Sequence, residues 1–253
     1  MPKKNKITGT ETMVEVAADN TADNTTADMT ADMTAGMGAP SRGFPVVGIG
    51  ASAGGLAAFE AFFSGMPADT EPGMAFVLVQ HLAPDHKSIL TDLIRRYTRM
   101  QVYEVEDGMV VKPNCAYIIP PNRDMAFLNG TLQLLEPSSP RGQRLPIDFF
   151  FRSLAQDQRE RAICIVLSGT GSDGTQGLRA IKGEGGMAMA QNPASTEYDG
   201  MPRSALGTGL VDFELPPAEM PAQGTRLSGS NMPSLNLVIK SRLTEMSTWR
   251  NVT

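Results

Sequence analysis

The stretch from Phe44 to Phe63 joins a short β-branched run to a glycine-rich turn and then to an alanine-rich apolar run. This order predicts a buried strand, a tight turn and a buried helix. Within the turn, residues 50–54 read Gly-Ala-Ser-Ala-Gly, the G-x-S-x-G spacing of a nucleophile elbow, in which small residues let a sharp turn expose the hydroxyl of Ser52 above a sheet. The first N–H groups of the helix would point back at the turn, where they would stabilise a developing oxyanion.

Two other interpretations of this stretch stay open at this point. Residues 48–55 carry glycine at positions 48, 50, 54 and 55 and so resemble a loose dinucleotide-binding fingerprint, because the same strand–turn–helix unit can also cradle phosphate. Alternatively, the glycines only allow a helix to pack closely on a strand. The remaining chain has to decide between these interpretations.

Composition divides the 253 residues into three parts. Residues 1–42 are rich in Thr, Ala, Asp and Met and are predicted to form a disordered, low-complexity leader, because they hold almost no large apolar side chains. Residues 43–223 have the size of one α/β domain. Residues 224–253 begin with a Ser/Gly/Asn-rich run and are predicted to be a tail or linker.

Charge and cysteine content exclude several classes of protein. A net charge of -5 gives no reason to expect a nucleic-acid partner, and no apolar run approaches the roughly 20 residues that cross a bilayer. The basic start, Met1–Lys6, is followed by no apolar core of a secretory signal, so we expect a cytoplasmic protein. Cys115 and Cys164 lie in apolar runs and are expected to be buried thiols. With two histidines in the chain, no metal site and no cofactor is expected.

The apolar periodicity predicts an α/β fold with a doubly wound, mostly parallel sheet, flanked by helices on both faces. A small antiparallel β-hairpin insertion is expected around Asn129-Gly130. Further strand-like runs are 74–80, 101–105, 115–119, 161–167, 186–191 and 210–213, and the expected helices are 87–98, 147–158, 175–183 and a short one ending near 205.

Three of the expected strands lead into Ser52, His81 and, after a glycine turn, Asp173. Ligand sites of open parallel sheets form outside the carboxyl ends of the strands, so these three side chains are expected at one edge. A hydroxyl, an imidazole and a carboxylate are the parts of a catalytic triad. Each has a plainer interpretation: His81 as an ordinary loop histidine, and Asp173 as a helix N-cap. The rival base, His86, is expected on the surface.

Six motifs in chain order resemble the catalytic domain of the chemotaxis protein-glutamate methylesterases, and together they span about 44–222. They are Gly-Ile-Gly-Ala-Ser-Ala-Gly-Gly (48–55), Val-Gln-His-Leu-Ala-Pro-Asp-His (79–86), Tyr-Ile-Ile-Pro-Pro-Asn (117–122), Pro-Ile-Asp-Phe-Phe-Phe-Arg-Ser-Leu-Ala (146–155), Leu-Ser-Gly-Thr-Gly-Ser-Asp-Gly (167–174) and Gly-Met-Pro-Arg-Ser-Ala (200–205).

The resemblance implies a serine hydrolase that releases methanol from methylated glutamates of chemoreceptors, with glutamine deamidation in some relatives. It implies Ser52 as nucleophile, His81 as base and Asp173 as the third member, with backbone N–H groups of Ala53 and Thr170 as oxyanion donors. The family often has Thr and Met at these last two positions, a difference that bears on substrate fit. Many members also carry a receiver domain before the esterase, whereas the leader precedes it here, as in fusions with a methyltransferase module.

Two hypotheses from other classes remain. A nucleotide-binding domain would use the glycine turn, but Gln80-His81 stands where an acidic ribose partner is expected. A non-catalytic interaction module would dock a receptor or sensor protein without turnover.

Overall fold

The computed structural model describes residues 43–66, 71–80, 89–137 and 143–229. The predicted disordered leader, the chain beyond 229, His81 and His86 lie outside these described residues.

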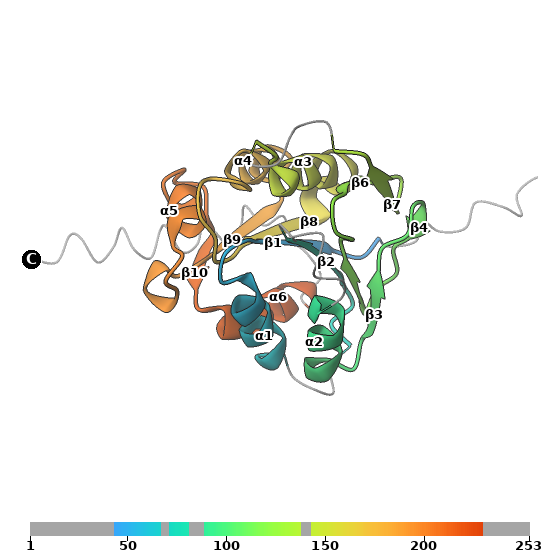
Figure 1. Ribbon diagram of the computed structural model, residues 1–253, viewed down its shortest axis with the longest axis horizontal. Coiled ribbons are helices and arrows are strands. Elements are labelled where there is room, and N and C mark those ends of the chain that lie inside the picture. The colour runs from blue at the N-terminus through green and yellow to red at the C-terminus, as the bar shows by residue number, and fades with distance from the viewer. Residues whose placement is uncertain (1–42, 67–70, 81–88, 138–142, 230–253) are drawn as a thin grey trace, which may run out of the picture. The chain divides into compact units, whose positions relative to one another are not determined.

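The centre of the described fold is a seven-stranded sheet with the order β10-β9-β8-β1-β2-β5-β3, in which every neighbouring pair is parallel. Helices α1, α2 and α6 cover one face and helices α3, α4 and α5 the other (Figure 1). The predicted doubly wound α/β fold is therefore confirmed. The strands of this sheet are β1 Val46–Ala51, β2 Ala75–Gln80, β3 Gln101–Glu104, β5 Cys115–Ile118, β8 Ala162–Val166, β9 Met187–Gln191 and β10 Phe213–Leu215. The helices are α1 Gly55–Ser64, α2 Ile89–Tyr97, α3 Pro146–Gln158, α4 Thr175–Gly183, α5 Gly200–Leu206 and α6 Met220–Gly229.

Strand β1 lies at the point where the strand order reverses. It pairs with β2 on one side and with β8 on the other, and the chain builds the β2 side of the sheet before it returns to β8. In open α/β sheets the ligand-binding crevice forms outside the carboxyl end of the strands at such a point. The turn that contains Ser52 begins at that end of β1.

Two glycines of β1 let helix α3 pack closely on the strand. A Cβ atom on Gly50 would lie 2.3 Å from Cγ2 of Ile147, and one on Gly48 would lie 2.9 Å from Cε1 of Phe151. Close helix–strand packing, one of the three interpretations of the glycine pattern, is therefore confirmed at these two positions.

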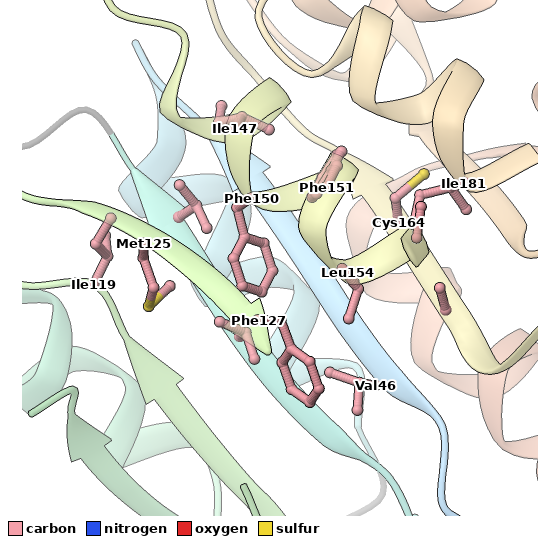
Figure 2. Close-up of a cluster of buried hydrophobic side chains, with 14 of the residues drawn as sticks. Val46, Ile119, Met125, Phe127, Ile147, Phe150, Phe151, Leu154, Cys164 and Ile181 are labelled. Carbon is pink, nitrogen blue, oxygen red and sulfur yellow. The ribbon is translucent and has the colours of Figure 1, made fainter. Parts of the chain in front are cut away.

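Each face of the sheet has its own apolar core. Figure 2 shows one of them: Phe150 and Leu154 of α3 lie over β1, near Val46, with Cys164 of β8 and Ile181 of α4 beside them. The thiols of Cys115 and Cys164 are buried, as predicted. On the other face, Phe62, Phe63 and Phe76 meet edge to face with ring centroids 5.2–6.0 Å apart.

The predicted hairpin is present as β6 Asp124–Leu128 and β7 Thr131–Leu135. Both turn residues have positive φ, 50° at Asn129 and 75° at Gly130, as a two-residue hairpin turn requires. A short strand, β4 Met109–Val110, adds a third antiparallel member on the far side of β7.

One expected strand begins later than predicted. Residues 210–212 are not part of β10, which starts at Phe213. The carboxylate of Asp212 accepts the N–H of Ala188 (2.8 Å) and binds the ammonium of Lys182 (2.8 Å). The N–H of Asp212 donates to the carbonyl of Ala188 (2.9 Å), but the N–H of Ala188 is taken by the Asp212 side chain, and the register of β10 with β9 starts at Phe213.

Candidate active site

Ser52 follows directly after β1 and is half-buried. Its N–H donates to the carbonyl of Ser168 (2.9 Å), and its own carbonyl accepts the N–H of Gly55 at the start of α1 (2.9 Å). Gly54 has a φ of 72°, which a glycine adopts without strain. These contacts form the strand–turn–helix geometry that the G-x-S-x-G spacing predicts.

The turn that follows β8 lies against this elbow. A Cβ atom on Gly169 would lie 3.0 Å from the Cβ of Ser52, so the two turns are in contact at this point. The segment before and at the start of α5 holds Gly169 in place: its N–H donates to the carbonyl of Tyr198 (2.8 Å), and its carbonyl accepts the N–H of Met201 (2.9 Å).

The side chain of Ser168 ties the two turns together. Its hydroxyl donates to the carbonyl of Ala53 (2.8 Å) and lies 2.7 Å from the hydroxyl of Thr196, while its N–H donates to Oε1 of the buried Gln191 (2.8 Å). Sequence reasoning missed the role of Ser168 and Gln191. The only signal was that Ser168 stands inside the Leu-Ser-Gly-Thr-Gly-Ser-Asp-Gly motif and that Gln191 ends an apolar strand.

Asp173 is buried, with 3% of its surface exposed. Its carboxylate accepts the N–H groups of Ile147 (3.1 Å), Asp148 (2.9 Å) and Gly174 (2.9 Å). Sequence reasoning allowed for a helix cap at Asp173, and a cap is found. The carboxylate, however, caps the first turn of α3, a helix that lies earlier in the chain, and not the helix α4 that it precedes.

Asp148, in the first turn of α3, makes the reverse contact. Its Oδ1 accepts the N–H of Gly177 in the first turn of α4 (2.6 Å), and 3% of its surface is exposed. Burial raises the pKa of the Asp148 carboxyl above its usual 3.8, and the nearby charge of Asp173 adds to this. The Gly177 N–H and the charge of Arg152 oppose the rise.

Ala53 and Thr170, the two expected oxyanion donors, follow the two residues at which the turns meet. Within the part of the chain that the structure describes, neither of their N–H groups donates a hydrogen bond to protein. Ala53 is half-buried and Thr170 is exposed.

The position of His81 lies outside the described residues, so the structure does not test it as a base. The preceding residue, Gln80, pairs in register with Ala51, which directly precedes Ser52. The chain therefore reaches the same edge of the sheet one residue before His81.

A cavity of about 550 Å³ opens beside the elbow. Its lining includes Gly54, Ala57, Ala61, Ser168, Thr196 and Tyr198. Among the residues that the structure describes, no group of three His, Cys, Asp or Glu side chains is placed to hold a metal ion. Nor does any described helix have the length and apolar character needed to span a membrane.

Comparison with known proteins gives a consistent result. The family model described as CheB methylesterase matches residues 47–223. The protein-glutamate methylesterase/protein-glutamine glutaminase of the group 3 operon of Rhizobium meliloti is 33% identical over 172 residues, which cover 68% of this chain and 48% of the relative. An uncharacterized 104.1 kDa protein of Rhodobacter capsulatus is 45% identical over 126 residues, 50% of this chain and 13% of the relative.

Among solved structures, the catalytic domain of the CheB methylesterase of Thermotoga maritima superposes with a TM-score of 0.67 at 28% identity, over 73% of this chain and 99% of that chain. The matched part of this chain spans about half or less of the length of these two curated relatives.

Proposed function

Because this chain belongs to the CheB methylesterase family, we propose that it is a serine hydrolase that removes methyl groups from glutamate methyl esters on chemoreceptors. The products are methanol and a receptor glutamate, and the reaction acts in chemotaxis signalling. The names of the relatives also include protein-glutamine glutaminase, so deamidation of receptor glutamines is proposed as a second reaction of the same site.

The observation that carries this proposal is the contact between the Ser52 elbow and the turn after β8. The half-buried Ser52 meets Gly169, and four residues further along the same turn Asp173 is held by three backbone N–H groups. A nucleophile and a preorganised carboxylate on adjoining turns are two parts of a Ser-His-Asp triad. His81 is proposed as the third part, the general base.

In the proposed mechanism, Oγ of Ser52 attacks the ester carbonyl while His81 accepts its proton. Asp173 orients the imidazole and stabilises its positive charge. The N–H groups of Ala53 and Thr170 bind the oxyanion, and each such donor contributes on the order of 3 kcal/mol to catalysis. Methanol leaves with the proton from His81, and a water molecule then hydrolyses the glutamyl-enzyme by the same steps in reverse order.

The proposed partner is a methylated chemoreceptor or another sensory protein with methylated glutamates. A methyltransferase module in the same full-length protein is a further proposal from the resemblance to fusion proteins. We place the activity in the cytoplasm, with no nucleic-acid partner and no insertion into the membrane.

The proposal is tested by labelling the protein with an active-site serine phosphonate, mapping the label by mass spectrometry, and measuring methanol release from methylated receptor membranes. We expect label on Ser52 and release of methanol, and loss of both in Ser52→Ala with an unchanged fold. Near-full methanol release by Ser52→Ala would overturn the nucleophile. Absence of both label and release from the unmodified protein would favour a binding module.

A further inference from the structure

The N-termini of helices α3 and α4 are capped reciprocally by two carboxyl groups, Asp173 and Asp148, and this reciprocal capping is the carboxylate exchange. Asp173, two residues before α4, accepts N–H groups from the first turn of α3, and Asp148, in the first turn of α3, accepts an N–H group from the first turn of α4. Neither helix has a side-chain cap from its own N-cap residue, Leu145 or Gly174. The first turn of each helix therefore donates to a carboxyl group that belongs to the other helix or directly precedes it.

This exchange makes the position of the Asp173 carboxylate depend on Asp148. Ile147 and Asp148, whose N–H groups both donate to the Asp173 carboxylate, belong to the first turn of α3, so these two donors move with that turn. The bond from Gly177 to Asp148 fixes the distance between that turn and α4. We infer that Asp148 is a positioning residue for catalysis, which holds the Asp173 carboxylate in the orientation that the reaction needs.

The packing around the exchange supports this role. A Cβ atom on Gly177 would lie 2.4 Å from the Cβ of Phe151 and 3.1 Å from the carbonyl oxygen of Asp148, so only glycine lets the two helices come this close. Both carboxylates are buried, and a water molecule has little access to replace a lost acceptor. Loss of the Asp148 acceptor should therefore shift the helix starts rather than be absorbed by solvent.

The inference rests on the proposed function, because it assumes that Asp173 acts in the hydrolysis. Active sites tolerate little displacement, and an error of about 1 Å can cost on the order of a hundredfold in rate. The cavity beside the elbow is lined by none of the residues of the exchange, so the loss is expected in kcat and not in KM.

The test compares Asp148→Ala with Asp148→Asn. Asparagine has a side chain of the same length as aspartate and keeps an acceptor oxygen. A matched control is Asp212→Asn, because Asp212 is another largely buried carboxylate that accepts a backbone N–H, but at the edge of β9 and away from Ser52. Ester hydrolysis gives kcat and KM, and urea unfolding gives stability. Amide hydrogen exchange of peptides that cover 146–150 and 173–177 reports the positions of the helix starts.

We expect Asp148→Ala to lower kcat by on the order of tenfold to a hundredfold, with KM changed by less than about twofold and faster exchange in both peptides. Asp148→Asn should restore most of kcat, and Asp212→Asn should lose stability without losing kcat. If Asp148→Ala does not fold, Asp148→Leu fills the same space without an acceptor and takes its place.

A loss that falls on KM alone, or an equal loss of kcat in Asp212→Asn at equal stability, would overturn the inference. Failure of the proposed function is seen separately, as a wild-type protein that does not hydrolyse the ester. In that case amide hydrogen exchange still tests whether Asp148 holds Asp173. Unchanged protection of residues 173–177 in Asp148→Ala would show that it does not.

Discussion

At the scale of single residues, the candidate site depends on places where only a hydrogen atom fits. Gly169 is the clearest example, because a Cβ atom there would lie 2.1 Å from Sδ of Met201 and 3.0 Å from the Cβ of Ser52. Met201 is fully buried, so its thioether cannot swing into solvent. Any larger residue at 169 must therefore displace Met201, Ser52 or the turn that carries the proposed oxyanion donor Thr170.

We therefore predict that Gly169→Ala lowers kcat on the order of a hundredfold, the scale expected for a displacement of about 1 Å. Overpacking of a buried site should also cost about 1–3 kcal/mol of stability. Steady-state ester hydrolysis and urea unfolding measure the two effects. A variant with wild-type kcat would mean that the Gly169 turn takes no part in oxyanion binding.

A second prediction at this scale concerns pH. Burial raises the pKa of Asp148, so the folded state binds this proton more tightly than the unfolded state does. The contribution of Asp148 to stability is therefore fully present below its usual pKa of 3.8 and is lost as pH rises through the raised value. The charged groups that face it are Asp173, which strengthens the effect, and Arg152, which weakens it.

Asp148→Asn cannot titrate, so its free energy of unfolding should gain on that of the wild type as pH rises above 3.8, and then level off. Urea denaturation of both proteins at several pH values between the acid range and neutrality measures this difference. Two curves that stay parallel across the range would contradict the prediction.

At the scale of elements, the close packing of α3 on α4 brings each of the two carboxylates, Asp148 and Asp173, within hydrogen-bonding distance of the other helix start. An alanine in place of a helical glycine normally stabilises a helix by about 0.5–1 kcal/mol. At Gly177 the new Cβ would lie 2.4 Å from the Cβ of Phe151, an atom fixed to the backbone of α3. We therefore predict the opposite sign for Gly177→Ala, a loss of about 1–3 kcal/mol.

The matched control lies on the same helix. A Cβ atom on Gly183 would meet nothing within 4 Å, so Gly183→Ala should be neutral or slightly stabilising. Urea or thermal unfolding of the two variants measures the difference. Equal effects at 177 and 183 would show that α4 can move away from α3 without cost.

The elements of this fold were predictable to a large extent, because their signals are local. Residues 175–183 were predicted as a helix with the bounds that α4 has, since a glycine turn precedes it and a glycine-rich run follows it. The Asn129-Gly130 hairpin was predicted from its turn residues. The late start of β10 was missed, because it depends on Asp212 binding an N–H of a different strand.

The position of Ser52 was predictable from the sequence, but the contacts of the candidate site were not. The position of Ser52 after β1 follows from a local motif, but the cap that Asp173 provides to α3 joins residues 25 and 26 positions apart. Such a contact exists only once the two helices have packed. The hydrogen bond from Ser168 to Ala53 joins residues 115 positions apart. It forms only after the two turns have come together, so it could not be predicted from the sequence.

At the scale of the whole molecule, two apolar cores share one sheet, and the last described helix closes one of them. Met220, at the start of α6, is 1% exposed and belongs to the core on the α1 side. Pro221 and Gly224 line the same apolar wall as Phe62 and Met74. Figure 1 shows α6 next to α1 on that face of the sheet.

This arrangement predicts where the chain can be shortened. The fragment 43–229 keeps the whole of α6 and both cores. Its free energy of unfolding should therefore lie within about 1 kcal/mol of that of the full chain. The fragment 43–223 ends inside α6 and keeps only residues 220–223, a single turn that is too short to offset the cost of helix nucleation. Met220 would then lose its fixed place in the core, at a cost of about 2 kcal/mol.

Urea unfolding of the full chain and the two fragments measures this order of stability. Equal stability of 43–223 and 43–229 would place the end of the folding unit at the predicted boundary of 223, and a weaker 43–229 than full chain would show that residues outside it stabilise the domain.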